Sequence, residues 1–239
     1  MTSTIDEEHM KAVILAGGLG KRLEPLTKTV PKPLLPVGEK SILDIQIGNL
    51  AKYGFKTIYI ATYYKADFVE SIIGSSKKHG VDIVFSKEPK PLGTCGPLSV
   101  LREELDTPFI LMNGDILTNL DFNQLIRYGN NQDADLTVVT KTVQTPFNFG
   151  HVVSRDNYIV DIEEKPNIEL EILAGIYFMR PGIMKHIPEN TYFGIDSLIK
   201  KMLEESLPVA RYHMTEYWLD IGSPETYDEA QIAYEIHFK

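Results

Sequence analysis

The chain has 239 residues, 43% of them hydrophobic, so it is long and apolar enough to bury one substantial core. Its formal net charge of −9 at pH 7 argues against a nucleic-acid partner, because affinity for a phosphate backbone depends on a basic surface. The single cysteine, Cys95, excludes an internal disulfide and suits the reducing cytoplasm, and no apolar run approaches the roughly 20 residues of a transmembrane helix, so no membrane partner is expected.

Residues 1–10 are polar and acidic and lack the apolar segment of a secretory signal. We therefore expect a disordered leader there and a folded unit over 11–239. Apolar runs predict buried strands at 12–16, 57–61, 81–85, 108–112 and 135–140, and amphipathic stretches predict helices at 41–53, 65–74, 95–105 and 121–130. This alternation predicts an α/β fold, with a Rossmann-like, mostly parallel sheet and helices on both faces. Ligands of such sheets bind beyond the carboxyl ends of the strands.

After residue 140 the pattern changes. Short alternating runs at 149–153, 158–164 and 171–179 predict a small antiparallel subdomain. A helix near 195–206, a strand near 209–213 and a final helix over 223–239 follow. Ser223 is the expected N-cap of that last helix and Pro224 its first residue.

The loop after the first predicted strand carries three glycines, Gly17, Gly18 and Gly20, directly before two cations. Backbone without side chains can approach a phosphate closely, and its N–H groups bind anions. The spacing is not that of a Walker A loop, because Arg22 follows the Gly-Lys pair where Ser or Thr is needed. It is not that of a dinucleotide fingerprint either, because no carboxylate ends the second predicted strand. With a net charge of +4, residues 11–32 predict a site for a small anion.

The segment reads Leu15-Ala16-Gly17-Gly18-Leu19-Gly20-Lys21-Arg22-Leu23-Glu24-Pro25-Leu26-Thr27, followed by Pro31-Lys32-Pro33. It resembles the signature of the sugar-1-phosphate nucleotidyltransferases, also called nucleotide-sugar pyrophosphorylases. Lys21 departs from that signature, since the family usually has Thr there. The later segment Leu92-Gly93-Thr94-Cys95-Gly96-Pro97-Leu98 is most similar to GDP-mannose pyrophosphorylases and related guanylyltransferases. The resemblance extends from Lys11 to the final helix, with the motifs in the family's order.

Further motifs support the resemblance and suggest roles. Asn113-Gly114-Asp115 and Trp218-Leu219-Asp220-Ile221-Gly222 match the family's two metal-binding segments. Glu164-Lys165-Pro166, Phe149-Gly150 and Ala174-Gly175-Ile176-Tyr177 match its sugar-phosphate-binding segments. Leu173 stands where the family usually has Asn, which implies one polar contact fewer and favours a less usual sugar or a cyclitol.

The resemblance implies transfer of a nucleotidyl group from an NTP, preferably GTP, to a sugar 1-phosphate, giving an NDP-sugar and pyrophosphate by Mg²⁺-assisted in-line displacement. Residues 11–140 would form the nucleotide-binding half and residues 141–222 the sugar-phosphate-binding half. The implied catalytic residues are Arg22, Lys32 and Lys165, and the implied metal ligands are Asp115 and Asp220. The implied nucleotide-binding residues are Leu15, Ala16, Gly17, Gly18, Gly20, Lys21, Arg22, Gly93 and Thr94, and the implied sugar-binding residues are Gly150, Glu164, Lys165, Ala174 and Gly175.

The sequence leaves the base, the acceptor and the oligomeric state open, a homo-oligomer included. A thymidylyl-, uridylyl- or cytidylyltransferase, or an enzyme acting on a cyclitol or a non-sugar phosphate, fits the same motifs. A non-catalytic nucleotide-sugar sensor is a rival from another class, but the cations and carboxylates that such a protein should have lost are present. For Gln46 and Asp44, on the helix predicted at 41–53, a surface role is favoured over one near the nucleotide.

Overall fold

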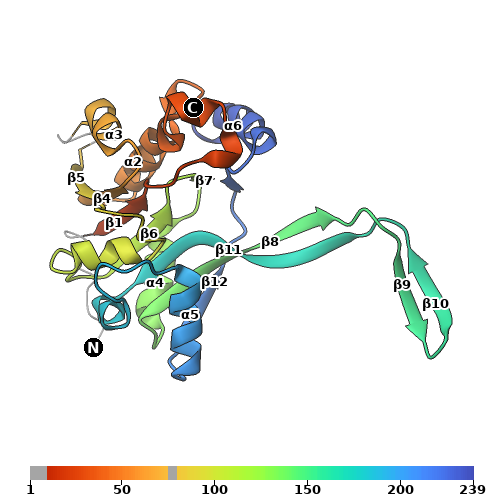
Figure 1. Ribbon diagram of the computed structural model, residues 1–239. Coiled ribbons are helices and arrows are strands. Elements are labelled where there is room, and N and C mark those ends of the chain that lie inside the picture. The colour runs from red at the N-terminus through yellow and green to blue at the C-terminus, as the bar shows by residue number, and fades with distance from the viewer. Residues whose placement is uncertain (1–9, 75–79) are drawn as a thin grey trace.

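The computed structural model describes residues 10–74 and 80–239, so the leader predicted over 1–10 lies outside the described residues except for Met10. Its centre is a seven-stranded sheet in the order β12-β8-β11-β6-β1-β4-β5. These strands are β1 (Lys11–Leu15), β4 (Thr57–Thr62), β5 (Asp82–Lys87), β6 (Phe109–Asn113), β8 (Leu136–Pro146), β11 (Asn167–Met179) and β12 (Val209–His213). Six strands run in one direction and only β11 runs against them. The mostly parallel sheet predicted from the sequence is confirmed (Figure 1).

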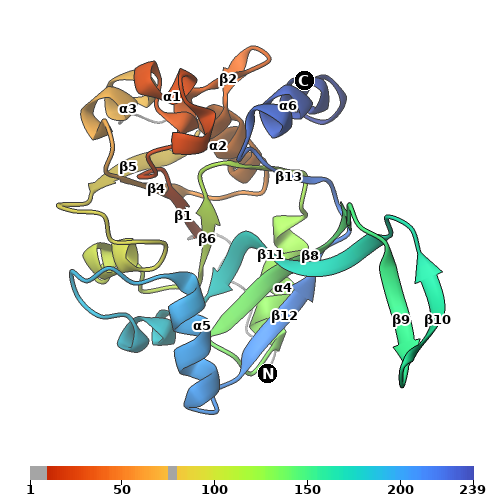
Figure 2. The same ribbon diagram turned by 45° about the vertical axis from the view of Figure 1, so that its right-hand side comes forward.

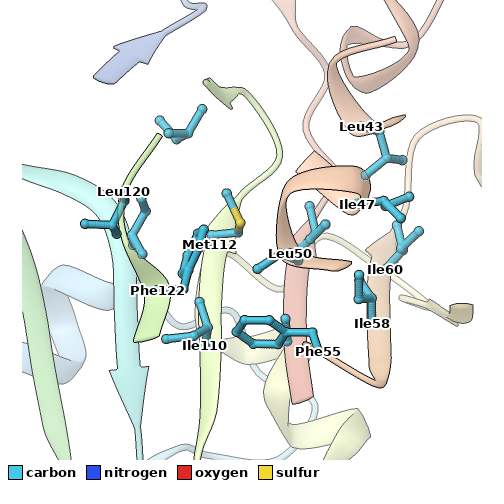
Figure 3. Packing of buried hydrophobic residues seen from close by; sticks show 14 of the residues in the cluster. Leu43, Ile47, Leu50, Phe55, Ile58, Ile60, Ile110, Met112, Leu120 and Phe122 are labelled. Carbon is cyan, nitrogen blue, oxygen red and sulfur yellow. The ribbon is translucent and has the colours of Figure 1, made fainter. Parts of the chain in front are cut away.

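Helices cover both faces of this sheet, as the sequence predicts. The face with Ala12 and Ile14 of β1 packs against α2 (Ile42–Lys52), α3 (Ala66–Ile73) and α4 (Phe122–Asn131). Figure 3 shows part of this layer, with Leu43, Ile47 and Leu50 beside Ile58 and Ile60. The opposite face, with Val13, packs against η4 (Gly96–Leu101), η5 (Pro181–His186) and α5 (Ile195–Glu204). Consecutive residues of β1 therefore enter two separate cores, because side chains alternate along a strand.

The segment predicted as a helix over 95–105 is instead the short 3₁₀ helix η4. Ser99 Oγ donates to the Gly96 carbonyl at 2.7 Å. It therefore occupies the acceptor that the N–H of residue 100 would use in an α-helix. Cys95 at its start is buried, and desolvation raises the pKa of its thiol.

A third core lies beyond the carboxyl ends of the parallel strands. It joins short elements of the first 41 residues to the end of the chain. Its residues come from η2 (Lys21–Leu23), β2 (Pro36–Val37), the start of α2, β7 (Ile116–Thr118), β13 (Trp218–Asp220) and α6 (Pro224–His237). The short elements α1 (Leu26–Thr29), η3 (Lys32–Leu34) and β3 (Lys40–Ser41) lie between η2 and α2 along the chain. Helix α6 begins as predicted, with Ser223 accepting a hydrogen bond from the Thr226 N–H and Pro224 as its first residue. Among the described residues, no helix has both the length and the apolar character needed to cross a bilayer.

Strands β8 and β11 continue as a two-stranded ribbon beyond the sheet, and the ribbon leads to the hairpin of β9 (His151–Arg155) and β10 (Tyr158–Glu163). We call residues 141–173 the arm. The arm projects from the body in both views (Figures 1 and 2), and every residue of β9 and β10 is exposed. The antiparallel strands predicted after residue 140 are confirmed, but β8 and β11 are both longer than their apolar runs suggest, because their outer halves are not buried.

Candidate active site

The glycine loop after β1 lines an open pocket of about 490 Å³ at the carboxyl edge of the sheet. The residues lining it are Leu15, Gly17, Gly18, Leu19, Tyr63, Glu88, Pro91, Leu92, Gly93, Thr94, Asn113, Gly114, Asp115 and Tyr192. Six of them belong to the set predicted from the sequence: Leu15, Gly17, Gly18, Gly93, Thr94 and Asp115. Ala16 is buried behind the loop, where its N–H donates to the Ala61 carbonyl at 2.8 Å. The pocket therefore gathers segments that are far apart in the sequence, as an α/β sheet edge does.

Gly20 allows the loop to turn back onto the Pro-Lys-Pro segment. Its φ of +62° lies in the left-handed region, and a Cβ there would lie 3.2 Å from Lys32 Cβ. The Gly20 carbonyl also accepts a hydrogen bond from Thr27 Oγ1 at 2.8 Å. Together these contacts hold Lys32, on η3, close to the glycine loop.

The turn that carries Asp115 lies directly against the end of β1. The Gly114 N–H donates to the Leu15 carbonyl at 2.9 Å, and a Cβ on Gly114 would lie 2.4 Å from that oxygen, so only glycine fits. On the other side, Gln46 Nε2 donates to the carbonyls of Asn113 at 2.9 Å and Ile116 at 2.8 Å. Gln46 is only 3% exposed, so the surface role favoured from the sequence is wrong. The buried side-chain amide of Gln46 therefore fixes the backbone on both sides of Asp115.

Replacing Gln46 by alanine is expected to lower the free energy of unfolding by about 2–3 kcal/mol, because two carbonyls lose their donor in a buried place. Urea unfolding monitored by circular dichroism measures this loss. Asn49→Ala is the matched control one helical turn along α2, where a single bond to the Thr118 carbonyl is lost. A loss for Gln46→Ala no larger than that of the control would contradict this role of Gln46.

Asp220 reaches the same place from the other end of the chain. Strand β13 pairs antiparallel with β7 so that Asp220 lies opposite Ile116, and the Ile221 N–H donates to the Asp115 carbonyl at 3.0 Å. Burial raises the pKa of the Asp220 carboxyl above its ordinary value, and the negative charge of Asp115 raises it further, while Lys32 and Arg22 oppose the shift. A partly buried pair of carboxylates therefore lies at the end of the pocket.

Two cations face this carboxylate pair. Lys32 Nζ donates to Asp115 Oδ2. The guanidinium nitrogens of Arg22 and the Oδ1 of Asp220 all lie 3.4 Å from the position that a Cβ on Gly222 would take. The structure thus brings together Arg22, Lys32, Asp115 and Asp220, which the sequence singled out from three distant segments.

The carboxylate pair has the properties of an incomplete metal site. Oδ1 of Asp115 and Oδ1 of Asp220 are both buried, and neither has a hydrogen-bond partner among the described residues. An unpartnered buried carboxylate oxygen is costly unless a cation completes it. Within residues 10–74 and 80–239, no group of three or more His, Cys, Asp or Glu side chains could hold a metal ion. Two carboxylates that share a hard cation with water and phosphate oxygens are typical of Mg²⁺.

The predicted sugar-binding residues fall into two groups. Ala174 and Gly175 lie beside the carboxylate site, since the Ala174 carbonyl accepts from Trp218 Nε1 at 2.8 Å. A Cβ on Gly175 would lie 2.7 Å from the Asn113 amide nitrogen.

Gly150, Glu164 and Lys165 form the second group, on the exposed arm. Glu164 Oε2 is 3.1 Å from the Cβ position of Gly150, so this group also keeps its members together. Ala174 and Gly175 thus lie next to the carboxylates, whereas Gly150, Glu164 and Lys165 lie on the arm that projects from the body (Figure 1).

Among the pocket residues that were not predicted are three with long polar side chains that lie outside the motifs: Glu88, Tyr63 and Tyr192. Glu88 Oε2 accepts the Leu92 N–H at 2.9 Å, and its Oε1 lies 2.8 Å from the Cβ position of Gly17. Burial raises the pKa of Glu88, while the Leu92 hydrogen bond opposes that shift. Tyr63 directly follows β4 and Glu88 directly follows β5, two and three residues beyond the strands predicted over 57–61 and 81–85. Their position at the carboxyl edge was therefore a usable signal. Tyr192 lies in a loop before α5 and carries no such signal.

Comparison with known proteins agrees with this geometry. Residues 11–236 match the family model described as nucleotidyl transferase. The chain belongs to the nucleotidyl transferase family. The chain is 35% identical over 228 residues to a mannose-1-phosphate guanyltransferase of Yarrowia lipolytica, covering 91% of the chain and 62% of that protein. It is 32% identical over 241 residues to a UTP–glucose-1-phosphate uridylyltransferase of Synechocystis sp., covering 92% of the chain and 62% of that protein. The chain thus spans a little over 60% of the length of these two relatives.

Solved structures show the same fold over almost the whole chain. HddC from Yersinia pseudotuberculosis in complex with GMP-PN superposes with a TM-score of 0.72 at 28% identity, covering 94% of this chain and 99% of that one. A protein from Bacillus anthracis described as a glucose-1-phosphate thymidylyltransferase superposes with a TM-score of 0.78 at 26% identity, covering 96% and 97%. The comparisons therefore show the family and the fold of this chain. The names of the similar proteins specify different nucleotidyl groups: guanylyl, uridylyl and thymidylyl.

Proposed function

We propose that the protein transfers a nucleotidyl group from an NTP to a sugar 1-phosphate in a Mg²⁺-dependent reaction that releases pyrophosphate. The observation that carries this proposal is the meeting of two cations and two carboxylates, Arg22, Lys32, Asp115 and Asp220, at the end of a glycine-lined pocket. Phosphoryl transfer depends on positioning and charge stabilisation more than on a covalent nucleophile. Two polyanionic substrates can meet only where cations offset their repulsion.

In this reaction an oxygen of the sugar phosphate attacks the α-phosphorus of the NTP, and the bond to the pyrophosphate leaving group breaks. The glycine loop would bind the triphosphate through its N–H groups, while Arg22 would stabilise charge developing on it and Lys32 would anchor phosphate. Asp115 and Asp220 would hold Mg²⁺, which supplies charge neutralisation between the two phosphates when bound. Lys165 would orient the phosphate of the acceptor.

GTP is the proposed nucleotide. Two observations support this choice: the similarity to guanylyltransferases and the position of Glu88 in the pocket. Its carboxylate lines the pocket and has one oxygen, Oε1, on the Gly17 side, away from the Leu92 bond. A carboxylate only accepts hydrogen bonds. Guanine presents two adjacent donors, N1–H and N2–H₂, whereas uracil and thymine present one donor between two carbonyl oxygens that a carboxylate repels.

Glu88→Gln is expected to lower the ratio of kcat/KM for GTP over UTP about 10-fold or more, because a charge-assisted contact to guanine is lost and a donor that suits a pyrimidine carbonyl is gained. Steady-state pyrophosphate release with each nucleotide gives the ratio. Glu70→Gln is the matched control, since Glu70 pairs with Lys87 on the exposed side of α3. An unchanged ratio in Glu88→Gln would remove Glu88 from base selection.

The proposed reaction as a whole is tested by a matrix of GTP, UTP, dTTP, CTP and ATP against several sugar 1-phosphates and a cyclitol phosphate, scored by pyrophosphate release. We expect turnover with GTP and at least one acceptor, and none without divalent cation. Higher turnover with UTP or dTTP for every acceptor would overturn the guanylyl assignment. Silence with every pair, combined with tight binding of an NDP-sugar, would favour the sensor instead.

A further inference from the structure

The arm is built as a continuous and anchored structure. Its two strands are paired from Lys141, opposite Ile172, to Pro146, opposite Asn167. Beyond this pair the Phe147 N–H donates to the Pro166 carbonyl at 2.9 Å. At the base, Lys141 Nζ donates to the carbonyls of Thr215 at 3.1 Å and Glu216 at 2.8 Å. The paired strands, anchored at their base, project away from the body and carry the β9–β10 hairpin at their end, as both views show (Figures 1 and 2).

The arm carries far more exposed large hydrophobic side chains for its length than the body does. Eleven of the 22 exposed large hydrophobic side chains of the described residues lie on it. An isolated two-stranded hairpin is marginally stable in water, and apolar surface of this extent marks an interaction site.

The hairpin at the tip has one apolar face. Because paired residues of antiparallel strands share a face and consecutive residues alternate, Val152 and Ile162 lie on the same side, together with Ser154 and its partner Ile159. The side chain of Val153 points to the opposite side, which it shares with its partner Asp161 and other charged residues. The hairpin is therefore amphipathic, with an apolar face that nothing covers among the described residues.

The chemistry of the arm complements that of the body. Glu164 and Lys165 are exposed on it, and Lys165 has a φ of +49°, a conformation that is unfavourable for a residue with a side chain. Phosphate-binding cations and the carboxylate pair, by contrast, lie in the body. Reacting groups must be held about 3–3.5 Å apart, so arm and body chemistry must meet in one site.

We infer that the arm crosses to a second copy of this chain and completes that copy's active site with Lys165 and Glu164, while receiving the same from its partner. The assignment of an acceptor-binding role to Lys165 rests on the function proposed above. A two-fold axis makes such an exchange reciprocal, so both sites are completed and no arm is left over. Neither body alone then contains the whole reaction centre.

Size and charge fit a second copy as the occupant. A stable interface takes about 20–30 residues a side, which one arm can supply. Three cations against six carboxylates give the arm a net charge of −3, whereas five cations against one carboxylate give residues 11–32 a net charge of +4. Opposite charges favour the approach of an arm to the glycine loop of a partner and disfavour pairing of arm with arm.

The decisive experiment is complementation within a dimer. Two variants, Lys165→Ala with a damaged arm and Arg22→Ala with a damaged body, are co-expressed with different affinity tags, and the mixed species is isolated by two successive purifications. If the arms are exchanged, the intact body of the Lys165→Ala chain receives the intact arm of the Arg22→Ala chain. One of the two sites is then complete, so the mixed dimer should show about half of the wild-type activity, although each variant alone is nearly inactive.

A mixed dimer as inactive as its parents would overturn the exchange while leaving the proposed reaction standing, provided that the wild type is active. If the wild type turned over no substrate pair, the proposed function would fail, and the exchange would still be decided by mass. Light scattering coupled to gel filtration should give twice the 27.0 kDa of one chain. A monomer at micromolar concentration would refute the proposal.

Two adjacent valines give a matched test of the docking face. Val152 and Val153 are 45% and 43% exposed but lie on opposite faces of the hairpin. Val152→Glu should raise the dimer dissociation constant about 10-fold or more by placing a charge on the apolar face, and Val153→Glu should change it little. Equal effects of the two variants, or no effect of either, would contradict this docking face.

Discussion

Arg22→Ala is expected to lower kcat by about 10²-fold or more while leaving the fold intact. Arg22 is exposed on η2, and its guanidinium nitrogens and Asp220 Oδ1 each lie 3.4 Å from the position that a Cβ on Gly222 would take. A preorganised cation at this point stabilises charge that grows only as the α-phosphate is transferred, so its loss should appear in kcat more than in KM. Pre-steady-state and steady-state pyrophosphate release measure the effect, and circular dichroism checks the fold.

Lys28→Ala is the matched control for Arg22→Ala. Lys28 is an exposed cation of the same basic segment, but it pairs with Glu24 at 3.2 Å on α1. It should retain near wild-type kcat, because exposed ion pairs contribute little. Equal losses in both variants would reduce the role of Arg22 to general attraction of anions, and near-normal turnover in Arg22→Ala would remove it from the mechanism.

Asp220→Asn is expected to abolish Mg²⁺-dependent turnover and yet to raise the Tm of the metal-free protein by about 2–4 °C, which corresponds to about 1 kcal/mol for a chain of this size. Burial and the negative charge of Asp115 both raise the pKa of Asp220, so the ionised form is held unfavourably in the folded state. A neutral amide of nearly the same shape removes that repulsion. Thermal unfolding in EDTA, compared with unfolding in Mg²⁺ and GTP, measures both effects.

Asp115→Asn should behave oppositely in stability. It also removes a proposed ligand of Mg²⁺, but it breaks the pair with Lys32, so the metal-free Tm should fall. Both variants should lose the stabilisation that Mg²⁺ and GTP give to the wild type. An Asp220→Asn protein that kept this stabilisation and its activity would exclude Asp220 as a metal ligand.

The alternation of apolar runs was sufficient to predict most of the sheet and its covering helices. Buried parallel strands such as β1 and β4 are short, continuous apolar segments, and Ser223-Pro224 marks the start of α6 by capping chemistry alone. Short elements such as β7 and β13 were not predicted, because three residues give no period to detect. Their ladder is nonetheless what sets Asp220 beside Asp115.

The candidate site could be predicted where residues sit at strand ends or in a recognisable loop. Asp115, Lys32 and Arg22 were found in this way, and the structure brings them to one place. Gln46 was misjudged, because its burial arises from the tertiary contact of α2 with the turn after β6 and not from its own helix. The arm was also unpredictable, since alternating apolar residues indicate that a strand has an apolar face but not which surface covers it.

The β7–β13 ladder has a consequence for the order in which the molecule can become functional. Asp220 comes from near the end of the chain, and the α6 residue Tyr234 packs on Gly38 near its beginning. A polypeptide whose synthesis stopped before Trp218 would contain the glycine loop and Asp115 but would lack Asp220. If the two carboxylates hold the metal ion as proposed, such an incomplete chain would lack one ligand, and turnover would require synthesis past Asp220.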